Sequence, residues 1–176
     1  LAYRGYLARG ISGVTARAVF LSLCVFVPVN LAAMSLTRER GIFNLHGLLR
    51  AGVLAGECAF AALLAGPGVH ELVYALYQPL VEGVATGTLI PQIALLVTIV
   101  GFAIGIGVWW RSRSAIDLAF PAVIAAWVIA AQSPPGAAAH LYFIGAGALV
   151  LAAAVLQDVY RMAFRDELTG VPGRRA

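Results

Sequence analysis

The sequence contains no lysine, and charged residues make up only 11% of its 176 positions. Soluble domains carry roughly 25% charged residues, so this chain has too few to cover a surface that faces water. Hydrophobic residues make up 61% of the chain, and its mean hydropathy is +0.90. These values exclude an ordinary soluble domain and predict that lipid is the main solvent.

Residue types and motifs that carry chemistry are also scarce. Cys24 and Cys58 both lie in apolar runs, so we expect no disulfide framework. The sequence has no glycine-rich phosphate loop, no paired carboxylates on one helical face and no metal-ligand spacing. His46 is expected at the opposite membrane face from His70 and His140, which argues against haem. We therefore expect no catalytic residue, cofactor or metal in this chain.

Five apolar runs have the length of about 20 residues that a membrane helix needs. They lie at about 16–36, 48–66, 88–110, 115–132 and 138–158. Each must be helical, because unpaired backbone groups cannot be satisfied in lipid. The sequence thus predicts an all-α integral membrane bundle of about five transmembrane helices within 16–158, whose last helix extends into the cytoplasm. Prolines within or near the spans, Pro28, Pro91 and Pro121, are expected to kink helices.

The segment 69–83 is shorter and more polar, since it carries Glu71, Pro79 and Glu82. Its leucines recur at helical spacing, which is typical of a helix that lies in the membrane interface. We therefore expect an interfacial segment near 69–86. A sixth span through this region is the alternative.

The arginines favour a cytoplasmic C-terminus, because loops on the inner side of a membrane are enriched in basic residues. With five spans, the inner side holds Arg38, Arg40, Arg50, Arg111, Arg113, Arg161, Arg165, Arg174 and Arg175, and the outer side holds Arg4, Arg9 and Arg17. Such scattered arginines do not suggest nucleic-acid binding. Asp117 is expected as an ion partner of Arg111 and Arg113. Residues 1–15 precede the first span, and the opening Leu-Ala-Tyr is compatible with the tail of an upstream span, as in a fragment.

The closing stretch RDELTGVPGRRA carries a recognisable motif. It matches the pattern Asp-x-Leu-Thr-Gly-Leu-x-Asn-Arg-Arg at Asp166, Leu168, Thr169, Gly170, Arg174 and Arg175. The stretch resembles the opening motif of GGDEF domains, the catalytic domains of diguanylate cyclases. Val171 stands where that family usually has leucine, and Gly173 where asparagine is commonest.

The resemblance implies a signalling helix at 159–165 and the start of a truncated GGDEF domain at 166–176. The GTP- and Mg-binding residues of such domains come later than this motif, so none is assigned to this chain. The full-length protein would be a diguanylate cyclase of the bacterial inner membrane that makes cyclic di-GMP as a homodimer. This chain would be its sensor or anchor. The alternatives are a structural subunit or packing partner in a larger membrane complex, and a small transporter-like bundle, for which we find no convincing internal repeat.

Glu57 is the candidate ligand-binding residue inside the membrane. An ionisable group in lipid costs at least about 2.5 kcal/mol, so it usually faces protein or water. Glu57 therefore either forms a site for a small molecule, lipid, proton or ion, or is a carboxyl group bonded to Gln92 or Asn30.

Two small-residue patterns predict helix packing. Gly101 and Gly105 form a GxxxG motif, which allows close approach of helices, most simply within the chain. The last span carries a heptad stripe, Gly145, Ala148, Ala152, Val155, Val159 and Met162. Small residues favour packing in lipid, and the larger ones would bury apolar surface beyond it. We expect a homodimer seam here, with packing against the chain's own helices as the alternative.

Overall fold

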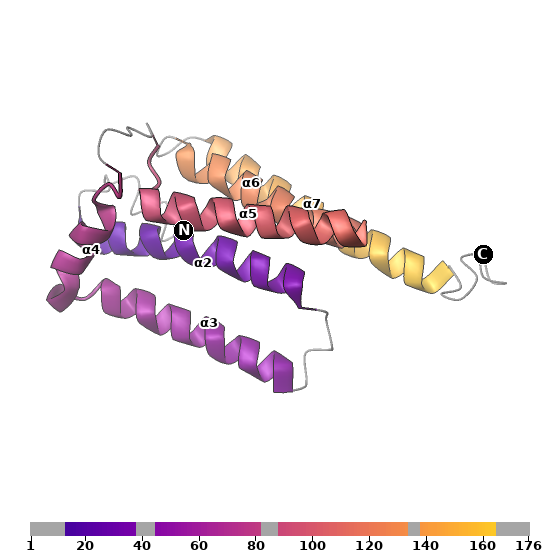
Figure 1. The fold of residues 1–176 in the computed structure, drawn as a ribbon, viewed down its shortest axis with the longest axis horizontal. Helices are drawn as coiled ribbons and strands as arrows, with labels where there is room; N and C mark the ends of the chain where they lie inside the picture. The colour runs from indigo at the N-terminus through magenta and orange to yellow at the C-terminus, as the bar shows by residue number, and fades with distance from the viewer. Residues whose placement is uncertain (1–12, 38–44, 82–87, 134–137, 165–176) are drawn as a thin grey trace.

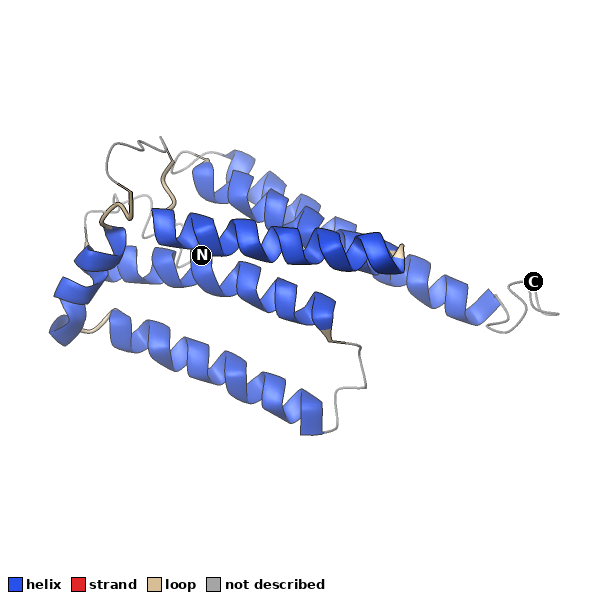
Figure 2. Cartoon of the chain, in the orientation of Figure 1, coloured by secondary structure: helices blue, strands red, loops and turns tan. Residues whose placement is uncertain are grey.

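The computed structural model describes residues 13–37, 45–81, 88–133 and 138–164 (Figure 1). Within these ranges the regular elements are all helices, joined by short loops, and there is no strand, as Figure 2 shows. The α-helices are α2 (Val14–Leu36), α3 (Leu45–Leu64), α4 (His70–Tyr77), α5 (Gln92–Ser112), α6 (Ala115–Gln132) and α7 (Ala138–Phe164). The predicted all-α fold is confirmed.

Five of the helices are long and apolar enough to cross a membrane: α2, α3, α5, α6 and α7. They run back and forth, so that α4 lies at the end of the bundle where α2 begins and α3 ends (Figure 1). At eight residues, α4 is about 12 Å long and cannot cross a bilayer. The chain is therefore an integral membrane protein, with five candidate spans among the residues that the structure describes.

The start of α5 differs from the prediction of a span from residue 88. The helix begins at Gln92, and Pro91 is its N-cap with φ −55° and ψ 145°. Leu89 is outside the helix, where its backbone N–H donates to Gln132 Oε1 over 2.9 Å. Pro91 therefore sets the start of α5 and does not kink it, because a proline N-terminal to a helix has no helical hydrogen bond to lose.

Three helices, α2, α5 and α6, pack against one another and form the centre of the bundle. The main cluster of buried side chains comprises Phe20, Leu21, Cys24, Ile90, Ala94 and Ala131. On one side of this unit α7 packs against α6, and on another side α3 packs against α2. The bundle thus consists of α2, α5 and α6 at its centre, with α7 packed extensively on α6 and α3 packed more sparsely on α2.

Proline–glycine contacts bring the central helices close together. A Cβ atom at Gly101 would lie 3.1 Å from the backbone oxygen of Pro28 in α2. A Cβ atom at Gly105 would lie 3.1 Å from Cδ of Pro121 in α6. Each proline lies inside its helix, where its ring removes one backbone hydrogen bond. The GxxxG motif is therefore used within the chain, with one glycine facing each neighbour.

Candidate functional site

The helix α3 directs its charged residues toward α2. Arg50 and Glu57 are half-buried and lie two helical turns apart, on the same face as the buried Leu64. Leu48 and Leu63 are each 70% exposed on other faces. This arrangement has a simple cause, since lipid cannot solvate a charge and α2 offers polar partners.

Asn30 and Glu57 form the polar contact in the middle of this seam. Asn30 Nδ2 donates a hydrogen bond to Glu57 Oε2 over 2.6 Å, and both residues are partly buried. Gln92 is elsewhere: its Oε1 accepts the backbone N–H groups of Leu80 and Val81, over 2.7 and 3.1 Å. The structure therefore brings together Glu57 and Asn30 but not Gln92, which tethers the segment after α4 to the start of α5.

Arg50 and Thr37 form a second polar contact, nearer the end of the bundle opposite α4. Arg50 donates from its guanidinium to Thr37 Oγ1, and Thr37 Oγ1 donates to the backbone oxygen of Ala33 over 2.9 Å. Within the described ranges no carboxylate forms an ion pair with Arg50. From the sequence, Arg50 was considered only for its contribution to orientation. Its spacing of seven residues from Glu57 was the available signal that both share one face.

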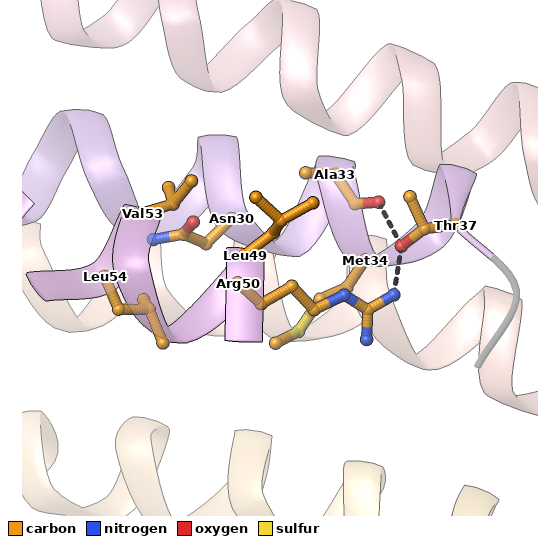
Figure 3. A pocket seen from close by; sticks show the side chains of 8 residues that line it. All are labelled: Asn30, Ala33, Met34, Thr37, Leu49, Arg50, Val53 and Leu54. Carbon is orange, nitrogen blue, oxygen red and sulfur yellow. Dashed lines mark hydrogen bonds between the residues drawn. The ribbon is translucent and has the colours of Figure 1, made fainter. Parts of the chain in front are cut away.

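A cavity of about 190 Å³ lies between these two polar contacts (Figure 3). Its lining comes from α2 and its C-cap, with Asn30, Ala33, Met34 and Thr37, and from α3, with Leu49, Arg50, Val53 and Leu54. Figure 3 shows the Arg50 guanidinium beside Thr37 at one end and Asn30 toward the other. The walls between them are apolar, so the cavity combines one cationic end with a hydrocarbon-like interior.

The other end of α3 is held by α4. Val73 of α4 is fully buried in a cluster with Ala18 and Leu64. The Tyr77 hydroxyl donates to the backbone oxygen of Arg17 over 3.0 Å, and the Arg17 guanidinium lies 5.7 Å from the Tyr77 ring centroid. These contacts fix α3 against α2 at the α4 end, while the cavity separates the two helices nearer the opposite end.

The turn between α5 and α6 differs from expectation. Arg113 has φ 55°, in the left-handed region, and its guanidinium lies 4.2 Å from the Trp110 ring centroid and 5.2 Å from that of Trp109. The predicted ion pairs of Asp117 with Arg111 and Arg113 are not formed in this described turn. Arg113 packs on the indole rings instead, since an aromatic face can attract a cation without a carboxylate.

The stripe on α7 is turned away from its neighbour. Gly147 faces α6, where a Cβ atom would lie 3.6 Å from Ala126 and Val123. The stripe members Gly145, Ala148, Ala152, Val155 and Val159 are all exposed. The side chain of Met162 lies outside the described part of the structure. The five described members of the stripe therefore do not pack against the chain's own helices.

The remaining candidates add no further site. In the described ranges, no group of three or more His, Cys, Asp or Glu residues is placed to hold a metal ion. Both cysteines are free thiols, with Cys24 buried and Cys58 exposed. The motif residues Asp166, Leu168, Thr169, Gly170, Arg174 and Arg175 lie outside the described residues.

Comparison with known proteins finds no relative. No protein-family model, curated protein or solved structure matches this chain.

Proposed function

We propose that this chain is the membrane sensor and anchor region of a diguanylate-cyclase-like receptor in the bacterial inner membrane. One observation carries the proposal: a long helix, α7, leads directly into the DELTG motif at 166–170. At 27 residues, α7 is about 40 Å long, whereas the hydrocarbon core is roughly 30 Å thick. The excess length suits a helix that carries a membrane event to a domain outside the bilayer.

The arginines support a cytoplasmic position for the end of α7. Arg50, Arg111, Arg113 and Arg161 belong to the end of the bundle where α7 finishes, and Arg17 lies at the opposite end beside α4. Basic residues are enriched on the cytoplasmic side of membrane proteins. The rings of Trp109 and Trp110 suit an interfacial position there, because indole rings gather at headgroup level.

The exposed stripe on α7 supports a homodimer. Since α7 uses Gly147 and Ala154 toward α6, the face with Gly145, Ala148 and Ala152 is left for a second copy. Small residues let two helix backbones approach closely in lipid. In this proposal, GTP and Mg belong to the catalytic domain alone, and the membrane region sets the encounter of two such domains.

The decisive test is the gene sequence beyond the codon for Ala176. We expect an open reading frame that continues into a complete GGDEF signature. Expression of that full-length protein should raise cyclic di-GMP in cells, and substitution of the signature should abolish the rise. An unrelated continuation of the frame, or a full-length protein with no effect on cyclic di-GMP, would contradict the proposal.

A further inference from the structure

The cavity between α2 and α3 has an unusual distribution of charge. Arg50 supplies a cation at one end, and Met34, Leu49 and Val53 supply apolar walls. A second cavity, of about 310 Å³ between α6 and α7, is lined by alanines, Leu118, Val150 and Gln157, and has no charged side chain. Only a ligand with an anionic head and a hydrocarbon tail complements both parts of the α2–α3 cavity.

We infer that the α2–α3 cavity binds one anionic phospholipid, with its phosphate on Arg50 and part of one acyl chain between the two helices. This inference goes beyond the proposed function and does not depend on it. A cyclase, a structural subunit or a transporter could each use such a lipid.

The guanidinium of Arg50 is suited to a phosphate. Arginine has five N–H donors in a planar fork that matches phosphate oxygens, and the bond to Thr37 occupies one donor. No carboxylate neutralises this cation among the residues that the structure describes. Arg50 also follows Gly47, where the apolar part of α3 begins, by less than one helical turn. It therefore lies near the depth at which lipid headgroups are found.

The walls of the cavity are suited to a narrow chain. Its volume of about 190 Å³ is below the roughly 300–1,000 Å³ of typical small-molecule pockets. Val53 is 56% exposed and Leu54 is 45% exposed, so the cavity opens toward the surrounding bilayer. A segment of an acyl chain can enter from that side while the rest of the lipid stays in its leaflet.

The Asn30–Glu57 pair limits how far the acyl chain can enter. Glu57 lies seven residues beyond Arg50, which is about 10 Å along α3. Because the amide of Asn30 and the carboxyl group of Glu57 are polar, burying them against an acyl chain would be unfavourable. The site therefore holds the part of one acyl chain that is nearest the headgroup. Its selectivity for anionic over neutral lipids comes from Arg50.

The test measures lipid retention by the purified chain. We would reconstitute it in phosphatidylcholine vesicles that contain a minority of phosphatidylglycerol, extract it in mild detergent and count bound lipids by native mass spectrometry. We expect one retained phosphatidylglycerol. Arg50→Gln should weaken retention about tenfold or more, because it removes a charge-assisted contact. Arg50→Lys should give an intermediate loss, since it keeps the charge but not the fork.

Two further variants separate this site from general surface charge. Val53→Trp should abolish retention by filling the cavity while it leaves Arg50 in place. Arg113→Gln is the matched control, because Arg113 is a cation at the same end of the bundle but on the indole rings, and it should retain lipid like the wild type. Each variant is first checked by helical circular dichroism and elution volume, and Arg50→Lys carries the headgroup test if Arg50→Gln does not fold.

Several results would overturn the inference. Equal retention of phosphatidylcholine would remove the anionic selectivity, and unchanged retention in Val53→Trp would remove the cavity from the site. Equal loss in Arg113→Gln and Arg50→Gln would indicate diffuse charge. Displacement by oleate but not by added phosphatidylglycerol would assign the site to a free fatty acid instead.

Discussion

The side-chain amide of Asn30 in α2 donates a hydrogen bond of 2.6 Å to Oε2 of Glu57 in α3. This bond provides a mid-membrane carboxyl group with a partner on the neighbouring helix. Hydrogen bonds between membrane helices contribute about 0.6 kcal/mol on average and up to about 1.7 kcal/mol. The hydrogen bond itself therefore adds little to the stability of the chain. Its main effect is to avoid the larger free-energy cost of a buried Glu57 carboxyl group that has lost Asn30.

Removal of Asn30 alone should destabilise the chain. We expect Asn30→Leu to lower the free energy of unfolding by about 1–3 kcal/mol, because the carboxyl group of Glu57 loses its partner. The double variant Asn30→Leu/Glu57→Leu should recover much of this loss, since neither polar group remains. Equilibrium unfolding in mixed micelles of mild detergent and dodecyl sulfate would measure both. A single variant as stable as the wild type would show that the bond is not formed in the membrane.

Glu57→Gln should preserve both folding and any signalling response of the full-length protein. The glutamine side chain keeps an oxygen that can accept the bond from Asn30. Unfolding in mixed micelles and the cyclic di-GMP response would be compared with the wild type. A lost response at normal expression and stability would instead assign a ligand-binding role to the carboxyl group of Glu57.

Alanine at Gly101 should separate α5 from α2. The added Cβ would lie 3.1 Å from the Pro28 backbone oxygen, which cannot rotate away. Overpacking of this kind costs about 1–3 kcal/mol. Gly107→Ala is the matched control, because nothing lies within 4 Å of a Cβ there, and it should be neutral or stabilising through helix propensity. Equal thermal stability of the two variants in detergent would argue against the close contact.

The left-handed residue Arg113 allows two opposing effects to be compared. Arg113→Ala should be destabilising, because it loses the contact with Trp110 and keeps φ 55°. Arg113→Gly loses the same contact, but glycine adopts this left-handed conformation without steric cost. A residue with a Cβ atom pays about 1 kcal/mol for that conformation. We therefore expect the glycine variant to unfold at a higher temperature than the alanine variant. Identical unfolding temperatures would exclude a strained turn.

Thiol accessibility should report the topology. In a background with both native cysteines replaced by alanine, a cysteine at Ser112 should react only from the cytoplasm. A cysteine at Gln78, after α4, should react only from the outside. The expectation follows from the opposite positions of the α5–α6 turn and α4 in the bundle (Figure 1). Labelling of both sites from one side would exclude the five-span topology.

Crosslinking should map the stripe on α7. In the full-length protein without native cysteines, single cysteines at Val159 and Met162 should form disulfides between subunits. Cysteines at Asp158 and Arg161 should not, because these positions lie outside the heptad stripe. Gel electrophoresis under non-reducing conditions would measure the dimer. Equal crosslinking at all four positions, or at none, would contradict the seam.

Much of the fold followed from hydropathy, because a chain in lipid must be helical wherever it spans. Glu57 could be assigned a polar neighbour for the same reason, and Asn30 was one of two named candidates. Gln92 was wrong as the partner of Glu57, since Pro91 was placed inside a span and Gln92 was therefore not expected at the start of α5. Arg50 was missed as a site residue because its charge was considered for orientation and not for its face of α3. The contact of Arg113 with the indole rings depends on a backbone conformation that sequence patterns do not reveal.

The proline–glycine contacts restrict how the bundle can move. Gly101 and Gly105 lie about one turn apart on α5, and each receives a proline from a different helix. A piston-like shift of α2 or α6 along the membrane normal would force a proline against a residue with a side chain. We therefore expect α2, α5 and α6 to tilt or rotate as one unit and not to slide past one another. In that case, a displacement of α3 that moves α2 would reach α7 as a change in the tilt of the central helices and not as a vertical shift.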